Sequence, residues 1–175
     1  MELNILYEIG KLHCDWLDSI MIFFTNLTNH GEIWIAIAVI LLCFKKTRTC
    51  GITMGISLIL MQIFGNVILK NLFTRARPCW VDPSVKLLIE NPTSYSFPSG
   101  HTFSSFAGAF VIFFYYKKAG VVALLLASII AFSRMYLFVH YPTDILGGFL
   151  FGLGTAMLAV AIVKKVEASK TSIRS

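Results

Sequence analysis

The chain has 175 residues, of which 57% are hydrophobic and only 14% are charged. Soluble domains average about 45–50% apolar and about 25% charged residues. The composition therefore excludes a disordered chain, argues against an ordinary soluble domain, and favours a protein embedded in a membrane. The formal net charge of +6 would suggest a nucleic-acid partner in a soluble protein. In a membrane protein, the distribution of basic residues among the loops instead indicates orientation, because basic loops stay cytoplasmic. We therefore expect no nucleic-acid partner.

The hydrophobic pattern predicts an all-α fold in which a short amphipathic helix precedes a bundle of transmembrane helices. Residues 3–13 carry apolar side chains at helical spacing, which predicts a helix that lies in the membrane interface. Six apolar segments follow, at about residues 15–29, 32–44, 51–72, 100–116, 119–139 and 143–163. A span needs roughly 20 apolar residues, so residues 1–175 hold one domain of six spans and no second domain. The first two segments are short and need a locally thinned membrane.

Glycines recur in the last predicted span. Gly147, Gly148, Gly152 and Gly154 are spaced so that a neighbouring helix can approach closely. We expect this helix to pack tightly against another.

The basic residues divide unevenly between the two sides of a six-span bundle. An even number of spans places both termini on one side, with ten of the fifteen Lys and Arg residues: Lys11, Lys45, Lys46, Arg48, Lys117, Lys118, Lys164, Lys165, Lys170 and Arg174. The sequence therefore predicts a multi-pass protein of the plasma (inner) membrane with both termini cytoplasmic and residues 74–98 outside. Four cations violate this trend close to the outer ends of spans: Lys70, Arg75, Arg77 and Arg134.

Two clusters on the predicted outer face are suited to binding an anion. Lys70 and Arg77 are two helical turns apart and share one face. Ser99 is a good N-cap residue for the fourth span and is followed by Gly100 and His101. The free N–H groups of a helix start attract anions. Basic residues at a span end also occur as interfacial anchors, so neither cluster is decisive alone.

A third cluster joins the fifth and sixth predicted spans. Arg134 lies near the end of the fifth span, His140 in the connection, and Asp144 in the first turn of the sixth, after Pro142. The Asp144 carboxylate can accept the proton of one His140 ring nitrogen and leave the other nitrogen free to attack. The alternative is that Asp144 only caps the helix.

The three clusters bring three cations, two histidines and one carboxylate to one membrane depth. Such a set suits a phosphate group close to the membrane surface. The acidic residues of this face are Glu32, Asp82, Glu90 and Asp144. They form no paired carboxylate cage of the kind that a two-metal phosphatase needs. We therefore expect a histidine nucleophile, no metal and no cofactor.

These motifs closely resemble, in order and spacing, the tripartite signature of the type 2 phosphatidic acid phosphatase superfamily. The residues that carry the resemblance lie within positions 70–144: Lys70-x6-Arg77-Pro78, Pro98-Ser99-Gly100-His101 and Ser133-Arg134-x5-His140-x3-Asp144. The superfamily contains integral-membrane lipid phosphatases and shares its site with vanadium haloperoxidases.

The resemblance implies a role for each signature residue. His140 would be the nucleophile that forms a phosphohistidine, Asp144 would orient it, and His101 would protonate the leaving oxygen and then activate water. The phosphate oxygens would be bound by Lys70, Arg77, Arg134, Ser99 and the Gly100 amide.

The resemblance therefore implies a metal-independent hydrolase that acts on lipid phosphates at the outer membrane face. Its partners would be the lipid phosphate and membrane lipids, with no obligate protein partner. Undecaprenyl diphosphate, a lipid of cell-wall biogenesis, is the favoured substrate. Phosphatidylglycerophosphate and phosphatidic acid, which belong to phospholipid metabolism, are alternatives. A phosphate-recognising transporter is an alternative of another class, but the sequence shows neither internal repeats nor broken polar helices at mid-membrane. The membrane spans argue against a haloperoxidase.

Overall fold

The computed structural model describes residues 1–29 and 31–174, with side chains up to residue 170, and these residues form helices and loops without a β-strand. The helices are α1 (Glu2–Gly10), α2 (Asp15–Asn26), α3 (Glu32–Cys43), α4 (Arg48–Met61), α5 (Lys70–Phe73), α6 (Pro78–Val81), α7 (Gly100–Tyr115), α8 (Lys117–Tyr136) and α9 (Pro142–Arg174). A π-helical segment, Gln62–Leu69, joins α4 to α5. The prediction of an all-α fold is confirmed for this part of the chain.

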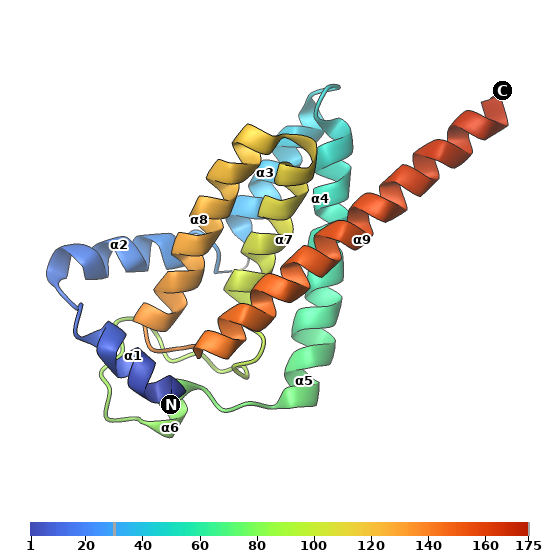
Figure 1. The fold of residues 1–175 in the computed structure, drawn as a ribbon. Helices are drawn as coiled ribbons and strands as arrows, with labels where there is room; N and C mark the ends of the chain where they lie inside the picture. Colours follow the sequence, from blue (N-terminus) through green and yellow to red (C-terminus); the bar gives the residue numbers. More distant parts are fainter. Residues whose placement is uncertain (30, 175) are drawn as a thin grey trace.

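Helix α7 is the central element of the bundle, and it packs mainly against α8 and α9 (Figure 1). Most of its residues are buried, including Phe103, Phe106 and Ala107. Trp34 of α3 is fully buried against it, and its indole N–H donates to the Ser105 hydroxyl at 3.1 Å. The functional residues at the start of α7 therefore sit on the most constrained helix of the molecule.

The glycines of α9 allow this helix to approach α7. A Cβ on Gly148 would lie 2.9 Å from the Ser99 carbonyl oxygen, and a Cβ on Gly152 would lie 2.8 Å from the Cβ of Phe106. A Cβ on Gly147 would lie 2.5 Å from the ring of Phe97. Close packing is therefore confirmed for these three positions. It is wrong for Gly154, where a Cβ would meet nothing within 4 Å.

Three stretches are long and apolar enough to cross a membrane: Arg48–Val81, Lys117–Tyr136 and Pro142–Lys170. Helix α3 is also apolar but shorter. Helix α2 has 12 residues, which at 1.5 Å per residue extend about 18 Å. It projects to one side of the bundle beside α8 and does not run along the other helices (Figure 1). The predicted first span, residues 15–29, corresponds in the structure to α2 and the residues that follow it. Residue 30 lies outside the described part of the chain. The count of six spans is not confirmed.

The two ends of the chain lie at opposite ends of the bundle (Figure 1). Because α2 does not run along the bundle, the chain enters it at α3 and leaves it at the far end of α9. Helix α1 instead packs beside the 74–98 segment, where the Tyr7 hydroxyl donates to the Asp82 carboxylate at 2.6 Å. The prediction that both termini lie on one side of the membrane is therefore not confirmed. The amphipathic helix at residues 3–13 does form, but its Leu6 is buried against protein.

The tight approach of α9 to α7 predicts different effects for alanine at two glycines of the same helix. Gly152→Ala should destabilise the protein by about 1–3 kcal/mol, because its new methyl group overpacks against α7. That loss corresponds to roughly 2–4 °C in melting temperature per kcal/mol. Gly154→Ala is the matched control, and it should melt at the same temperature or higher, because alanine is the better helix former. Thermal unfolding in detergent measures both. Equal melting temperatures would contradict the tight α7–α9 contact.

Candidate active site

Arg77 and Lys70 are held side by side by one serine of the 74–98 segment. Arg77 is the N-cap residue of α6 and is only 3% exposed. Its Nε donates to the Ser94 carbonyl oxygen at 2.6 Å, and its Nη2 donates to the Ser94 hydroxyl at 3.0 Å. Lys70 Nζ donates to the same hydroxyl at 3.1 Å. Ser94 therefore holds together two cations on different elements. The prediction that they share a face of one helix is wrong, because α5 ends at Phe73 and Arg77 has extended backbone at the start of α6.

Arg134 brings a third cation from the last turn of α8, and like Arg77 it is buried. Its side chain is 3% exposed, and one Nη donates to the hydroxyl of Thr25 on α2. Its Nε is buried and has no hydrogen-bond partner among the described residues. A buried donor without a partner is costly, so this N–H is available for an anion that enters the site.

The contacts of His140 assign its tautomer. Its Nε2 lies 3.2 Å from Nη1 of Arg77. Because a guanidinium group only donates hydrogen bonds, Nε2 must be the acceptor, and the ring proton is on Nδ1. Nδ1 faces the Ser96 hydroxyl at 3.4 Å and Asp144 Oδ2 at 3.5 Å. The lone pair of Nε2 therefore points toward the cations.

The same surroundings keep the His140 ring neutral. The residue is 1% exposed. Burial, together with the positive charges of Arg77, Arg134 and Lys70, holds the pKa of His140 well below its usual range. At neutral pH the imidazole is uncharged, and this is the state in which a ring nitrogen can act as a nucleophile.

Asp144 serves the helix start and the histidine at the same time. Its side chain is fully buried in the first turn of α9. Oδ2 accepts from the Tyr141 backbone N–H at 2.8 Å, as a helix-capping carboxylate does, and from the Ser96 hydroxyl at 2.5 Å. Oδ1 accepts from Arg75 Nη1 at 2.7 Å. Capping α9 and orienting His140 are therefore compatible roles.

The start of α7 lies beside the three cations. A Cβ on Gly100 would lie 3.9 Å from Lys70 Nζ, so the first turn of the helix faces this cation. His101 Nε2 lies 3.5 Å from Oδ1 of Asn29. Ser99 caps the helix as predicted, since its hydroxyl accepts from the N–H of Thr102 at 3.4 Å. It is fully buried and belongs to the helix cap rather than to the open site.

A cavity of about 710 Å³ opens from this cluster. Its wall includes six of the eight predicted site residues: Lys70, Arg77, Gly100, His101, Arg134 and His140. From there it continues between α3 and α4 as far as Leu42 and Gly51. This second part is lined mainly by apolar residues, including Ile35, Val39 and Ile59.

Four polar residues of the site were not among the site residues that the sequence predicted. Ser94, Ser96, Thr25 and Arg75 each contact a signature residue. The sequence did single out Arg75 in one way, as a basic residue on the side of the membrane where basic residues are few. The serines lie in an irregular segment, and nothing in their spacing marks them.

The arrangement can bind a tetrahedral anion and present a neutral nitrogen to it. Three cations meet only one buried carboxylate, Asp144, which already has partners. Within the described residues, no group of three His, Cys, Asp or Glu side chains is placed to hold a metal ion.

Comparison with known proteins agrees with this geometry. Residues 50–168 match the PAP2 superfamily. The chain is 34% identical over 160 residues to an undecaprenyl-diphosphatase of Sulfolobus acidocaldarius, covering 86% of this chain and 75% of that protein. It is 27% identical over 172 residues to phosphatidylglycerophosphatase B of Bacillus subtilis, with 87% and 78% covered.

A solved structure shares the fold. The crystal structure of Aquifex aeolicus LpxE superimposes with a TM-score of 0.78 at 25% identity, covering 91% of this chain and 94% of that one. The matched residues include all three signature motifs, which lie within positions 70–144. The chain belongs to the PAP2 superfamily and is a membrane lipid phosphatase, a hydrolase of phosphate esters.

Proposed function

We propose that this phosphatase hydrolyses undecaprenyl diphosphate through a phosphohistidine on His140, with residues 1–175 acting as one catalytic domain. The observation that carries the proposal is the neutral His140 ring, whose Nε2 lone pair faces three cations at the end of a long apolar cavity. An undecaprenyl-diphosphatase among the relatives supports the substrate.

The proposed reaction has two steps. His140 Nε2 attacks the terminal phosphorus, so an N–P bond forms while the P–O bond to the leaving group breaks. His101, which must enter this step as the imidazolium ion, gives one proton to the leaving oxygen and becomes neutral. Lys70, Arg77 and Arg134 stabilise the charge that develops on the phosphoryl oxygens. His101 then takes a proton from water, which attacks phosphorus and breaks the N–P bond. Inorganic phosphate leaves, and His140 is neutral again.

Two features of the cavity favour a lipid diphosphate. Asn29, Gln62 and Asn66 line it. Asn29 contacts His101, Asn66 lies beside Gly100, and Gln62 accepts from Asn66, so these amides could bind a leaving phosphate. Beyond them, the lining follows α4 and the π-helical segment from Asn66 back to Gly51, a distance of about 22 Å at 1.5 Å per residue. This apolar groove suits a long prenyl chain. Phosphatidic acid and phosphatidylglycerophosphate are the alternatives. Phosphatidic acid would leave the three amides without a second phosphate, and the second phosphate of phosphatidylglycerophosphate is a diester one glycerol unit away from the terminal one.

Purified enzyme should be compared on undecaprenyl diphosphate, phosphatidylglycerophosphate and phosphatidic acid in the presence of EDTA. We expect phosphate release from all three, with the highest kcat/KM for the diphosphate. His140→Ala should lower the rate by several orders of magnitude, because it removes the nucleophile. Strict dependence on added magnesium, or more than about a tenth of the wild-type rate in His140→Ala, would contradict the histidine mechanism. A preference for a monophosphate would contradict the substrate.

Asp144→Asn should act on kcat. The amide can present a donor where the Nδ1 proton of His140 needs an acceptor, and it removes the charge that stabilises the phosphohistidine cation. We expect kcat to fall roughly a hundredfold or more, with KM nearly unchanged, because the phosphate is held by the three cations. Steady-state kinetics against Arg134→Ala provides the contrast, since that change should also raise KM. If Asp144→Asn had the kinetics of the wild type, Asp144 would act only as a helix cap.

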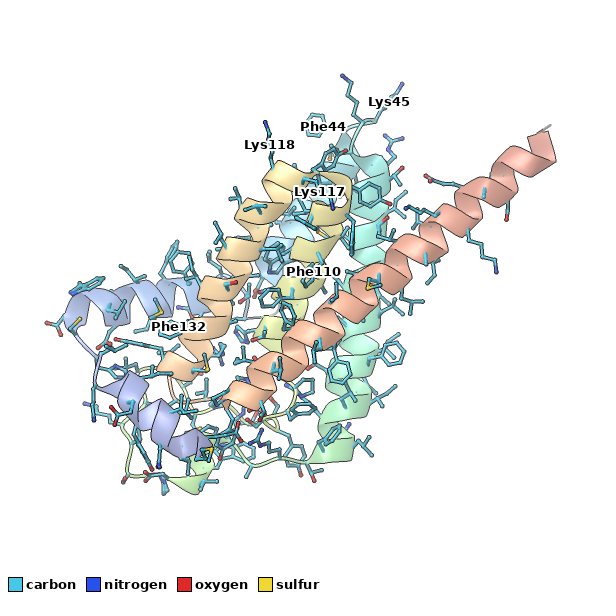
Figure 2. All side chains as sticks on the ribbon, viewed as in Figure 1. Phe44, Lys45, Phe110, Lys117, Lys118 and Phe132 are labelled. Atoms are coloured by element: carbon cyan, nitrogen blue, oxygen red, sulfur yellow. The ribbon has the colours of Figure 1, made fainter. Side chains whose placement is uncertain are left out.

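We also propose that the site faces away from the cytoplasm in the plasma (inner) membrane. Nine of the fifteen basic residues lie at the end of the bundle opposite the site: Lys45, Lys46, Arg48, Lys117, Lys118, Lys164, Lys165, Lys170 and Arg174. Figure 2 shows Lys45 and Lys118 projecting from this end. Basic loops stay cytoplasmic, so the C-terminal end would be cytoplasmic, and α1 would lie outside with the site.

Two exposed cysteines test this orientation. Cys14 lies between α1 and α2 at the site end, and Cys43 lies at the opposite end. A membrane-impermeant maleimide added to intact cells should label Cys14, and Cys43 only after permeabilisation. Cys79 is buried and should not react. Cys14→Ser is the control and should abolish external labelling. Labelling of Cys43 in intact cells would invert the proposed orientation.

A further inference from the structure

Arg75 lies between the buried carboxylate of the site and the first helix of the chain. Its Nη1 donates to Asp144 Oδ1 at 2.7 Å and to the Thr143 hydroxyl at 2.6 Å. Its Nη2 pairs with the carboxylate of Glu2 on α1, and the guanidinium lies 4.0 Å from the centre of the Tyr141 ring. Arg75 is not a signature residue, and the reaction above gives it no role.

Glu2 closes this chain of contacts onto α9. Its Oε1 accepts from the Thr143 backbone N–H at 3.1 Å and from the Thr143 hydroxyl at 2.7 Å. A carboxylate at a free helix N–H is stabilised by the helix dipole. Helix α1 is therefore attached at the same turn of α9 that carries Asp144, next to α6 and the start of α9 (Figure 1). The ionic chain runs His140, Asp144, Arg75, Glu2.

The position of Arg75 affects both the geometry and the charge of Asp144. The contact at Oδ1 fixes the carboxylate plane, so that Oδ2 remains turned toward Ser96 and His140. The guanidinium also offsets the negative charge of a carboxylate that is fully buried. An uncompensated carboxylate 3.5 Å from His140 would favour the imidazolium ion, which has no lone pair to attack with.

We propose that Arg75, held by Glu2, is a positioning residue that orients Asp144 and keeps His140 unprotonated before attack. The inference rests on the proposed function, in which His140 is the nucleophile. Charged and titratable groups face His140 or its carboxylate from every surrounding element: Lys70 of α5, Arg77 at the start of α6, His101 of α7, Arg134 of α8, Asp144 of α9 and Arg75 itself. Of these, Arg75 is the cation bonded to Asp144 rather than directed at the cavity.

The test compares Arg75→Gln, Arg75→Lys and Glu2→Gln with the matched control Tyr7→Phe. The control removes the other polar contact of α1, to Asp82, and leaves the Asp144 chain intact. The readout is the pH dependence of kcat/KM and the separate kcat and KM values on the same lipid phosphate. Melting temperatures report folding independently.

In Arg75→Gln we expect kcat to fall roughly tenfold to a hundredfold, the size of loss that follows removal of a partner that orients a metal-binding histidine, with KM changed by less than about twofold. Loss of the cation leaves His140 easier to protonate, so its pKa rises and the acidic limb of the profile moves to higher pH. Arg75→Lys should restore part of kcat and of the shift. Glu2→Gln should lower kcat and move the acidic limb to higher pH, each by less than Arg75→Gln does. Tyr7→Phe should match the wild type.

An unchanged acidic limb in all Arg75 and Glu2 variants would overturn the proposal, since a merely structural anchor would alter stability alone. An equal shift in Tyr7→Phe would also overturn it, because the cause would then be the docking of α1. If Arg75→Gln fails to fold, Arg75→Lys and Glu2→Gln carry the same test. Inactive wild-type enzyme would instead refute the proposed function, so the two failures are distinguishable.

Discussion

The burial of two arginines, Arg77 and Arg134, close to one buried carboxylate is the constraint on which the site end of the molecule depends. Removing an ion from water costs several kcal/mol unless partners offset it. Arg77 and Arg134 are each 3% exposed, and the fold surrounds them with neutral acceptors: the carbonyl oxygens of Ser94 and Val139 and the hydroxyl of Thr25. These partners come from two connecting segments and from helix α2. These parts of the chain are therefore arranged around the arginines, and the positive charge that remains can attract an anion.

The contact between α7 and α9 brings the motifs together. The Ser99 backbone N–H donates to the Asp144 carbonyl oxygen at 3.2 Å, so the capping residue of one helix is bonded to the first turn of the other. This distance requires the small residues of α9, because any side chain at Gly148 would meet the Ser99 carbonyl oxygen. Packing in the bundle core thus determines how far His140 lies from the start of α7. A change well below the site can alter catalysis by changing that distance.

The contacts of His140 are consistent with the proposed reaction. Arg77 donates to Nε2, while Ser96 and Asp144 lie at Nδ1. In the proposed reaction, the guanidinium would transfer its hydrogen bond from His140 to a phosphate oxygen when the substrate enters, and this would free the lone pair of Nε2. Arg77 would then both protect the proposed nucleophile and bind the phosphate.

The sequence by itself determined the features that depend on local spacing. These are the all-α class, the caps formed by Ser99 and Asp144, the three motifs on one face, and the close approach at Gly147, Gly148 and Gly152. Helical periodicity and capping act over a few residues, and the motif residues carry charges that a membrane tolerates only for a reason. Each of these features is therefore visible in a short window of sequence.

Only the tertiary structure decided where α1 and α2 lie and which neutral residues hold the cations. At 12 residues α2 is shorter than the roughly 20 residues that a span needs, and its Met21 and Thr25 are buried where it packs against the end of α8 that carries Arg134. This packing leaves α1 at the site end. Ser94 and Ser96 have no charge and no periodicity, so their roles arise from the path of the 74–98 segment. Its path is set by long-range contacts between residues far apart in the chain, which no local pattern encodes.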